Sequence, residues 1–261
     1  EIASGDWSSD VCSSDLQATD IEHGPIECVF TRDEETGLTG AFEMKPGFMS
    51  GDYLINLDSE DEGQLFVSCA GGVRTEATYT VDEEKLPEGF STFNFVVKGL
   101  TGGHSGDDIN KNRANANKLL VRFLLEQCEK TDLRLCDIQA GGLHNAIPRE
   151  AHATVAVPTA YAATFVTELE AFVAKVREEF SVTEPDLTAA LEAVDAAPTC
   201  ICPEQAVRML KSLSVVHNGI FAMSQDLEGL VETSSNLASV RKQGNQVVAT
   251  TSQRSSVASN L

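Results

Sequence analysis

Residues 89–128 read GFSTFNFVVKGLTGGHSGDDINKNRANANKLLVRFLLEQC. The part from Gly89 to Val97 has the alternating pattern of a β-strand. A glycine-rich loop follows from Gly99 to Gly106. Asn115–Cys128 then repeats apolar side chains at helical spacing, so we expect an amphipathic helix there. This stretch therefore predicts a strand, a loop and a helix that packs on a sheet.

The same alternation of strands and helices continues toward the C-terminus. Strands alternating with helices, plus a hairpin, predict an α+β domain with its helices on one face of a sheet. The further predicted elements are strands at 133–138 and 151–157, a helix carrying Phe165, Leu169, Phe172, Val173 and Val176, a helix that begins at Pro203, and a hairpin of 237–241 with 246–251 that turns at Gly244-Asn245.

The composition narrows the class of protein. The chain has 261 residues, 42% of them hydrophobic, which is enough for one large domain or two modest ones. It carries 40 acidic and 19 basic residues, a formal net charge of −21, and such a surface repels phosphate backbones. No run of about 18 apolar residues occurs, so no transmembrane helix is expected. We therefore expect a chain that binds neither nucleic acid nor a membrane.

The cysteines and histidines indicate no closed metal-binding finger. Only Cys200 and Cys202 lie close together in sequence, and no CxxC pair occurs. Dispersed cysteines in a chain of this length indicate reduced, buried thiols of a cytosolic protein, because disulfide scaffolds are shorter and denser in cysteine. The seven cysteines stand at positions 12, 28, 69, 128, 136, 200 and 202.

Residues 1–16 (EIASGDWSSDVCSSDL) have no apolar periodicity, no basic start and no apolar centre. They resemble the translated read-through of a sequencing adaptor, so we leave them out of the fold prediction. A disordered native tail is the alternative. If the sequence starts inside a gene, it can also stop inside one, and we expect truncation at both ends.

Two acidic clusters each follow a predicted buried strand. The strands are Pro25–Thr31 (PIECVFT) and Asp52–Leu57 (DYLINL), and the clusters are Asp33-Glu34-Glu35 and Asp58-Ser59-Glu60. Open α/β sheets bind ligands beyond the carboxyl ends of their strands. Carboxylate oxygens suit Zn²⁺ or Mn²⁺, and a neighbouring carboxylate can take a proton from a metal-activated water. On charge pattern alone, solvated acidic loops are the more common explanation.

Several long motifs occur in an order that is typical of one enzyme family. They are HGPIECVFTRDEETGLTGAF (23–42), GDYLINLDSEDEG (51–63), CAGG (69–72), VKGLTGGHSG (97–106), NANKLLVRFL (115–124) and HNAIPREA (144–151). Over about residues 17–261 the chain resembles the aminoacyl-histidine dipeptidases, also called cytosol non-specific dipeptidases. These belong to the di-zinc exopeptidases, together with carnosinases and aminoacylases. The resemblance implies a partial α/β catalytic domain at 17–72 and an inserted α+β lid domain at 73–261.

The resemblance also implies roles for three carboxylates. By motif, Glu34 would be the general base, Glu35 a ligand of one zinc ion and Asp58 a ligand of the other. The family's zinc-binding H-x-D motif and its metal-bridging aspartate would lie upstream, and a last zinc-binding histidine would lie downstream. The chain would therefore hold only part of a site for two Zn²⁺ ions, for which Mn²⁺ or Co²⁺ are possible substitutes.

Three residues of the lid would face the substrate. His104 would help to bind substrate or stabilise the transition state, Asn145 would donate to the developing oxyanion, and Arg254 would bind the substrate carboxylate. Asp107 departs from the family pattern, because relatives often have a glycine at this position, so the resemblance does not determine the exact shape of this loop. Each residue also has a structural alternative. His104 could have only a structural role in its loop, Asn145 could satisfy the turn before Pro148, and Arg254 could form a surface ion pair.

We predict metal-dependent hydrolysis of dipeptides, of the Xaa-His type or broader, by an intact cytoplasmic protein that is a possible homodimer. The 261-residue chain alone is expected to be inactive. One alternative is a non-enzymatic, lid-like binding or oligomerisation module. Another is a related exopeptidase or deacylase of the same group.

Overall fold

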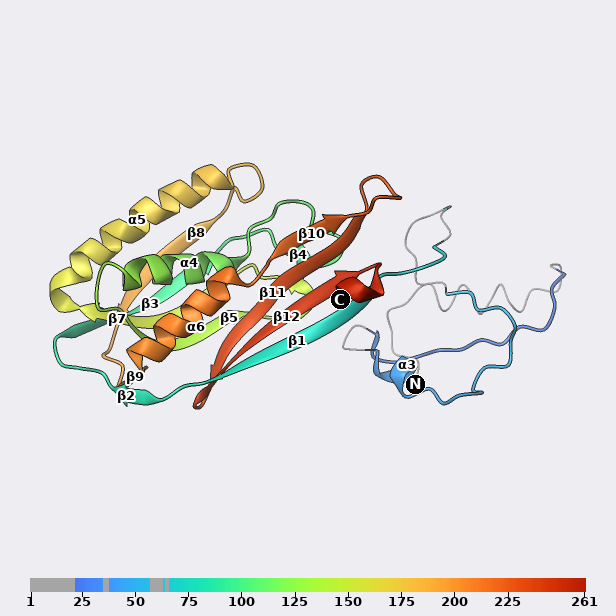
Figure 1. Cartoon of the computed structure of the whole chain (residues 1–261), viewed down its shortest axis with the longest axis horizontal. Coiled ribbons are helices and arrows are strands. Elements are labelled where there is room, and N and C mark those ends of the chain that lie inside the picture. The colour runs from blue at the N-terminus through green and yellow to red at the C-terminus, as the bar shows by residue number, and fades with distance from the viewer. Residues whose placement is uncertain (1–21, 35–37, 57–62, 64–65) are drawn as a thin grey trace. The chain divides into compact units, whose positions relative to one another are not determined.

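The computed structural model describes residues 22–34, 38–56, 63 and 66–261. The chain divides into two compact units, Glu1–Phe66 and Val67–Leu261, which we call the N-terminal unit and the C-terminal unit (Figure 1). This division falls six residues before the boundary expected between the catalytic part and the lid. Residues 1–16, for which we predicted a foreign origin, lie outside the described residues.

The C-terminal unit is built on an antiparallel sheet of eight strands in the order β1-β12-β11-β5-β7-β3-β8, with β10 paired to β11. Its strands are β1 (Gly71–Thr80), β3 (Phe90–Lys98), β5 (Arg134–Gly141), β7 (Ala151–Pro158), β8 (Thr188–Val194), β10 (Gly219–Met223), β11 (Val231–Gln243) and β12 (Gln246–Ser255). Two small sheets pair β2 (Glu83–Lys85) with β9 (Thr199–Ile201) and β4 (Gly103–His104) with β6 (Ala146–Ile147).

Three helices lie on one face of this sheet: α4 (Ala116–Cys128), α5 (Ala162–Glu179) and α6 (Pro203–Val215) (Figure 1). Short 3₁₀ turns at Thr159–Tyr161 and Ala258–Asn260 complete the unit. The predicted α+β fold with helices on one sheet face is confirmed here. The predicted helices and the predicted hairpin, which is that of β11 and β12, are also confirmed. The strands predicted at 89–97, 133–138 and 151–157 are found as β3, β5 and β7.

The core lies between the sheet and the helices and centres on Phe123 of α4. Its ring lies 4.9 Å from that of Phe95, 5.5 Å from that of Phe165 and 5.1 Å from that of Phe172, measured between ring centroids. Phe95, Phe123 and Phe165 are completely buried. Aromatic side chains of this size dominate core energetics, so this cluster joins β3, α4 and α5 into one body.

Two side chains at the start of α4, those of its N-cap Asn115 and of Lys118, satisfy backbone groups at helix ends. The side-chain oxygen of Asn115 accepts hydrogen bonds from the N–H groups of the second and third helical residues, which is the usual role of an N-cap asparagine. Lys118 Nζ donates to the carbonyl oxygens at the end of α6, those of Leu213, Ser214 and Val216. Burial lowers the pKa of Lys118. The ammonium group stabilises α6 because it satisfies the orphan carbonyls there.

The strands predicted at 25–31 and 52–57 are wrong over their described residues. Residues 25–31 and 52–56 form no strand, and the only multi-residue element described before Gly71 is the short helix α3 (Thr39–Phe42). A strand needs a neighbouring strand to pair its backbone groups. The described part of the N-terminal unit contains no strand, so these apolar runs have no pairing partner there.

The six cysteines that the structure describes are free thiols, but only some of them are buried. Cys136 and Cys200 are buried, whereas Cys28 and Cys69 are exposed. Burial raises the pKa of the Cys136 thiol to about 12 and also raises that of Cys200. The prediction of buried thiols was therefore wrong for Cys28 and Cys69, because they lie in segments without a core around them.

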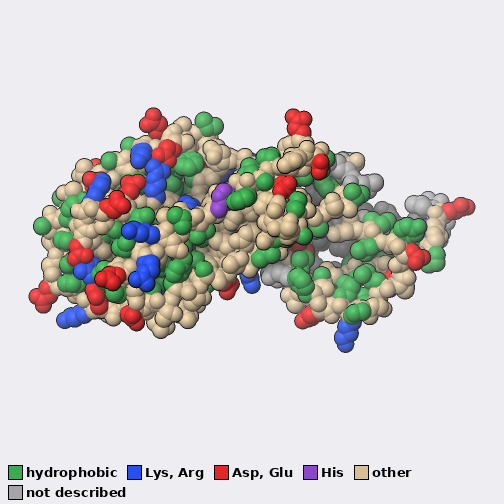
Figure 2. All heavy atoms as spheres, viewed as in Figure 1, with side chains coloured by type: hydrophobic (Ala, Val, Ile, Leu, Met, Phe, Trp, Pro, Cys, Tyr) green, Lys and Arg blue, Asp and Glu red, His purple; other side chains and the backbone are tan. Residues whose placement is uncertain are grey.

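Charged side chains are mixed over the surface of the C-terminal unit, where Figure 2 shows Lys and Arg interspersed with Asp and Glu. Within the described residues, no helix has the length and apolar character needed to cross a bilayer.

Candidate functional site

The structure brings together the three substrate-facing residues predicted in the C-terminal unit. Nη2 of Arg254, on β12, lies 3.2 Å from Nε2 of His104, on β4, although 150 positions separate them in sequence. The pairing of β4 with β6 places His104 opposite Ala146, and the N–H of Ser105 donates to the carbonyl oxygen of Asn145 at 2.7 Å. We call His104, Asn145 and Arg254 the His–Arg corner.

Glycines give the loop of His104 its shape. Gly103 has a φ of 135°, and a Cβ there would collide with Asp108 and Arg113. A Cβ on Gly106 would lie 3.0 Å from Nη1 of Arg254, so the guanidinium group rests against the loop backbone at this point. The positive φ at position 103 therefore favours glycine, and at position 106 the lack of a Cβ leaves room for the guanidinium group of Arg254.

A buried carboxylate joins the two ends of the segment 101–114, which contains His104. Glu184 is 1% exposed and accepts hydrogen bonds from the N–H groups of Thr101 at 2.6 Å and Ala114 at 2.8 Å. Within the loop, Asp108 accepts from the N–H of His104 at 2.8 Å. The ammonium group of Lys111 beside Asp108 lowers the pKa of that carboxyl group, and the N–H of His104 adds to this effect. The position of His104 is thus fixed by the fold.

A network of buried amides supports the segment of Asn145 from behind. Nδ2 of Asn236 donates to the carbonyl oxygen of Ala146 at 2.8 Å. Nδ2 of Asn115 donates in turn to Asn236 at 3.3 Å and to Asn218 at 2.8 Å. The side chain of Asn145 itself has no hydrogen bond within the described residues, so it is available to a ligand.

The sequence predicted neither Asn236 nor Asn218, and only the N-cap position of Asn115 carried a signal. It also gave no sign of Ser105, whose Oγ is buried without a hydrogen-bond partner in the part of the chain described. A lone polar residue in a strand or loop has no pattern that would mark it as part of a network.

Asp107, where the loop departs from the family pattern, contacts the other side of the His104 ring. Its Oδ2 lies 2.7 Å from Nδ1 of His104. The carboxylate is largely exposed, whereas 38% of the His104 side chain is accessible. The imidazole therefore lies between a carboxylate and a guanidinium group.

Two open pockets in the described part of the chain lie away from this site. One, of about 450 Å³, is lined by residues 29–32, 40, 43–45 and 48 of the N-terminal unit. Another of about 450 Å³ opens on the sheet face opposite the helices, beside Asn94, Asp137 and His152. Both are open and neither contains the His–Arg corner. We therefore identify the site by its convergent polar groups rather than by the size of a cavity.

The predicted metal ligands can be judged only by their chemistry. Glu35 and Asp58 lie outside the described residues, whereas Glu34 is described and exposed. The residues that the structure describes contain no group of three or more His, Cys, Asp or Glu side chains able to hold a metal ion. Carboxylates are suitable zinc donors, but these two are fewer than the roughly three to four protein ligands that one zinc ion takes. The donor type fits, and further ligands are required.

Comparisons with known proteins agree on one family. Residues 89–184 match the model of a peptidase dimerisation domain. The chain is 38% identical over 232 residues to the cytosol non-specific dipeptidase of Escherichia coli (strain K12). The aligned region covers 89% of this chain and 48% of that protein. It also resembles the crystal structure of aminoacylhistidine dipeptidase from Vibrio alginolyticus, with a TM-score of 0.79 and 38% identity, over 95% of this chain and 51% of that one.

The chain thus spans about half the length of the relatives that it matches. Over about half of their length, the chain resembles the aminoacyl-histidine dipeptidases, as the motifs predicted.

Proposed function

We propose that the complete protein hydrolyses dipeptides, either Xaa-His peptides or a broader set, and that this chain supplies its substrate-binding lid and part of its catalytic site. The observation that carries the proposal is the His–Arg corner, where polar groups from three distant segments converge. The names of the relatives support the same activity.

Arg254 is the group we assign to the carboxylate of the substrate. A guanidinium fork binds a carboxylate through two parallel hydrogen bonds. The chain has a formal net charge of −21, so its general field repels anions. A peptide carboxylate therefore needs a local cation, and Arg254 offers one beside two side chains that can bind the rest of the substrate.

The other groups act on the scissile bond. The amide of Asn145 and the imidazole of His104 can donate hydrogen bonds to the carbonyl oxygen as negative charge develops on it. Glu34 would take a proton from the attacking water and transfer it to the leaving amine. Glu35 and Asp58 would each help to hold one of two zinc ions, with Mn²⁺ or Co²⁺ as substitutes. A bound metal would polarise the carbonyl and acidify water.

We also propose that the protein is a cytoplasmic homodimer. The match of residues 89–184 to a peptidase dimerisation domain supports the dimer, and the name of the E. coli relative, a cytosol dipeptidase, supports the location. The same match favours one alternative, a C-terminal unit that serves only for oligomerisation. The C-terminal unit has its own hydrophobic core, so a role in oligomerisation would require no catalytic residue.

Zinc titration of the complete gene product distinguishes these possibilities. We expect Glu35→Ala and Asp58→Ala each to lower the zinc content and to reduce hydrolysis of Ala-His, whereas Glu22→Ala, at an exposed carboxylate, changes neither. Absence of zinc binding, together with no effect of Glu35→Ala, would show that the enzyme proposal is wrong. The 261-residue chain with added zinc should not hydrolyse Ala-His.

A further inference from the structure

The ring of His104 lies between one group that can only accept a hydrogen bond and one that can only donate. On one side, Oδ2 of Asp107 is 2.7 Å from Nδ1. On the other, Nη2 of Arg254 is 3.2 Å from Nε2. An ionised carboxylate has no proton to donate, and a guanidinium group has no lone pair to offer. Both neighbours therefore require the same imidazole form, with the proton on Nδ1 and the lone pair on Nε2.

One contact competes with this assignment. The backbone N–H of Asp107 lies 3.4 Å from Nδ1 and would need a lone pair on that atom. The carboxylate contact at 2.7 Å is much shorter and charge-assisted, and such bonds are about twice as strong as neutral ones. A lone pair on Nδ1 would also face the carboxylate oxygen and be repelled by it. The proton therefore belongs on Nδ1.

We propose that Asp107 is a positioning residue that holds His104 as its Nδ1–H tautomer, and that Arg254 occupies Nε2 until a ligand carboxylate takes the guanidinium group over. The guanidinium group of Arg254 should prefer the ligand carboxylate to Nε2. The nitrogen offers one neutral acceptor, whereas a carboxylate offers two charged acceptors whose spacing matches the two parallel N–H groups of a guanidinium. Gly106 leaves the guanidinium group against bare backbone, so no side chain at that position obstructs its movement.

The consequence for hydrolysis rests on the proposed function. While Arg254 occupies Nε2, His104 cannot donate to the scissile carbonyl. Once a carboxylate holds Arg254, Nε2 is free to take one proton from solvent and can then donate, and Asp107 stabilises the positive charge at Nδ1. Substrate binding and assembly of the oxyanion-stabilising group would thereby be coupled, so peptides with a blocked carboxyl end should be poor substrates.

The tautomer is measured by NMR on the 261-residue chain labelled with ¹⁵N-histidine, from the long-range couplings and shifts of the two ring nitrogens. Spectra are recorded over a range of pH, and the tautomer is read where the ring-nitrogen signals no longer change with pH. We expect a pyrrole-like Nδ1 and a pyridine-like Nε2 in His104. Asp107→Ala should shift the population toward the Nε2–H form, whereas Asp195→Ala, which removes an exposed carboxylate elsewhere, should leave it unchanged.

Ligand exchange is tested with sodium acetate as a carboxylate probe against sodium chloride of equal ionic strength. Acetate should move the Nε2 signal in the direction seen in Arg254→Met, and chloride should not. An Nε2–H tautomer in the unmodified chain, an unchanged tautomer in Asp107→Ala, or an Nε2 signal indifferent to acetate would each overturn the proposal. These signals need no hydrolysis, so they stand or fall separately from the dipeptidase activity.

Discussion

The two units of the chain contain similar apolar runs with different outcomes. FNFVV, within β3, lies between β7 and β8 and places Phe95 in the core, whereas ECVFT, residues 27–31, forms no strand. Phe123 is completely buried, but Phe42 is 81% exposed and Tyr53 93%. No described residue of the N-terminal unit is buried. An apolar run thus becomes a strand only when the surrounding chain supplies backbone partners and a core.

The largest predicted difference between the units is the response to truncation of a phenylalanine. Phe123→Ala should destabilise the C-terminal unit by about 3–5 kcal/mol, since it empties the centre of an aromatic cluster. Phe42→Ala should change the stability by less than about 0.5 kcal/mol because that side chain is exposed. Urea unfolding followed by helical circular dichroism measures both. Equal effects of the two changes would remove the distinction between the units.

A second comparison uses two glutamates with the same role and different burial. Glu184 accepts hydrogen bonds from the N–H groups of Thr101 and Ala114, and Glu27 accepts from the N–H and the hydroxyl of Ser50. In Glu184→Gln, the new NH₂ group must face one of two backbone donors, of which the N–H of Ala114 is buried and that of Thr101 half-buried, and this costs about 1–3 kcal/mol. Glu27→Gln, at an exposed site, should leave the unfolding midpoint unchanged.

Hydrogen exchange locates the effect of Glu184→Gln. The amides of Thr101 and Ala114 should lose protection, and the protection of α4 should change less. Unchanged protection of both amides would contradict the role of Glu184 as the support of the His104 loop.

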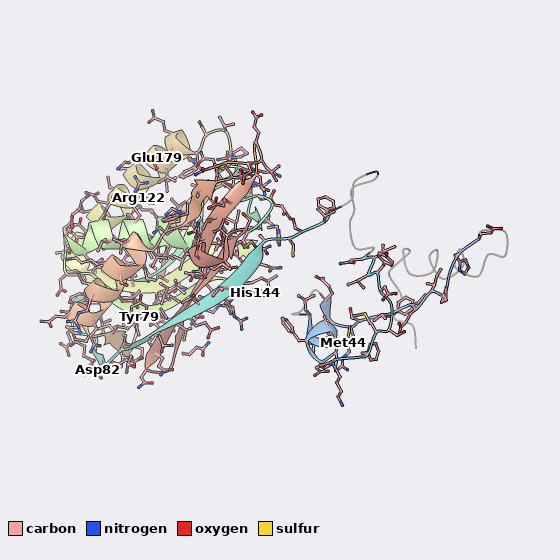
Figure 3. All side chains as sticks on the ribbon, turned by 45° about the vertical axis from the view of Figure 1, so that its right-hand side comes forward. Met44, Tyr79, Asp82, Arg122, His144 and Glu179 are labelled. Carbon is pink, nitrogen blue, oxygen red and sulfur yellow. The ribbon has the colours of Figure 1, made fainter. Side chains whose placement is uncertain are left out.

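The smallest predicted effect concerns ion pairs. Arg122 of α4 binds both carboxylate oxygens of Glu179 of α5, at 2.7 and 2.8 Å (Figure 3), whereas Arg32 contacts Glu43 through one oxygen at 3.2 Å. The Arg122–Glu179 pair is about one-third exposed, so Glu179→Gln should cost only about 0.5–1 kcal/mol. Glu43→Gln, in the more exposed pair, should have a smaller effect.

The pH dependence of the Arg122–Glu179 pair follows from the direction in which the pKa of Glu179 is shifted. Hydrogen bonding from Arg122 lowers the pKa of Glu179 in the folded protein. The pair therefore stabilises the fold above the unfolded carboxyl pKa of about 4.3, and this contribution is lost as the pH falls through the lower folded value. The difference in stability between Glu179→Gln and the unmodified chain should vanish in that acidic range; a difference that persists there would contradict the assignment.

Local sequence patterns predicted the helices and strands whose apolar spacing can be recognised within the segment itself. Helix α4 has both the apolar spacing and an N-cap asparagine, and β3 has the alternation of a strand. Strand β8 was missed because TAALEAV consists mainly of good helix formers, yet it pairs with β3 along its whole length. Strand β1 is polar and exposed, and its ten-residue register with β12 holds it in the sheet. Such long-range pairing overrides local propensity.

The sequence predicted which residues belong to the candidate site, but it did not predict how they are arranged. Family motifs pointed to His104, Asn145 and Arg254, but no spacing in the sequence indicates that β12 brings an arginine to the loop of His104. The contact of Asp107 with the ring was also unpredicted, since this residue appeared only as a departure from the family pattern. The roles of Glu34, Glu35 and Asp58 remain predictions from the motifs.

The central proposal is that Glu34 serves as the general base, and His104, Asn145 and Arg254 as substrate-binding groups, of a dipeptidase. Its most direct test is the rate of Ala-His hydrolysis by the zinc-loaded complete gene product and by its Glu34→Gln variant, with Glu22→Gln as the control. We predict hydrolysis by the unmodified protein and by the control, and a fall in kcat of about 10²- to 10⁴-fold in Glu34→Gln at unchanged zinc content. Full kcat in Glu34→Gln, or no hydrolysis of any dipeptide by the unmodified protein, would contradict the account.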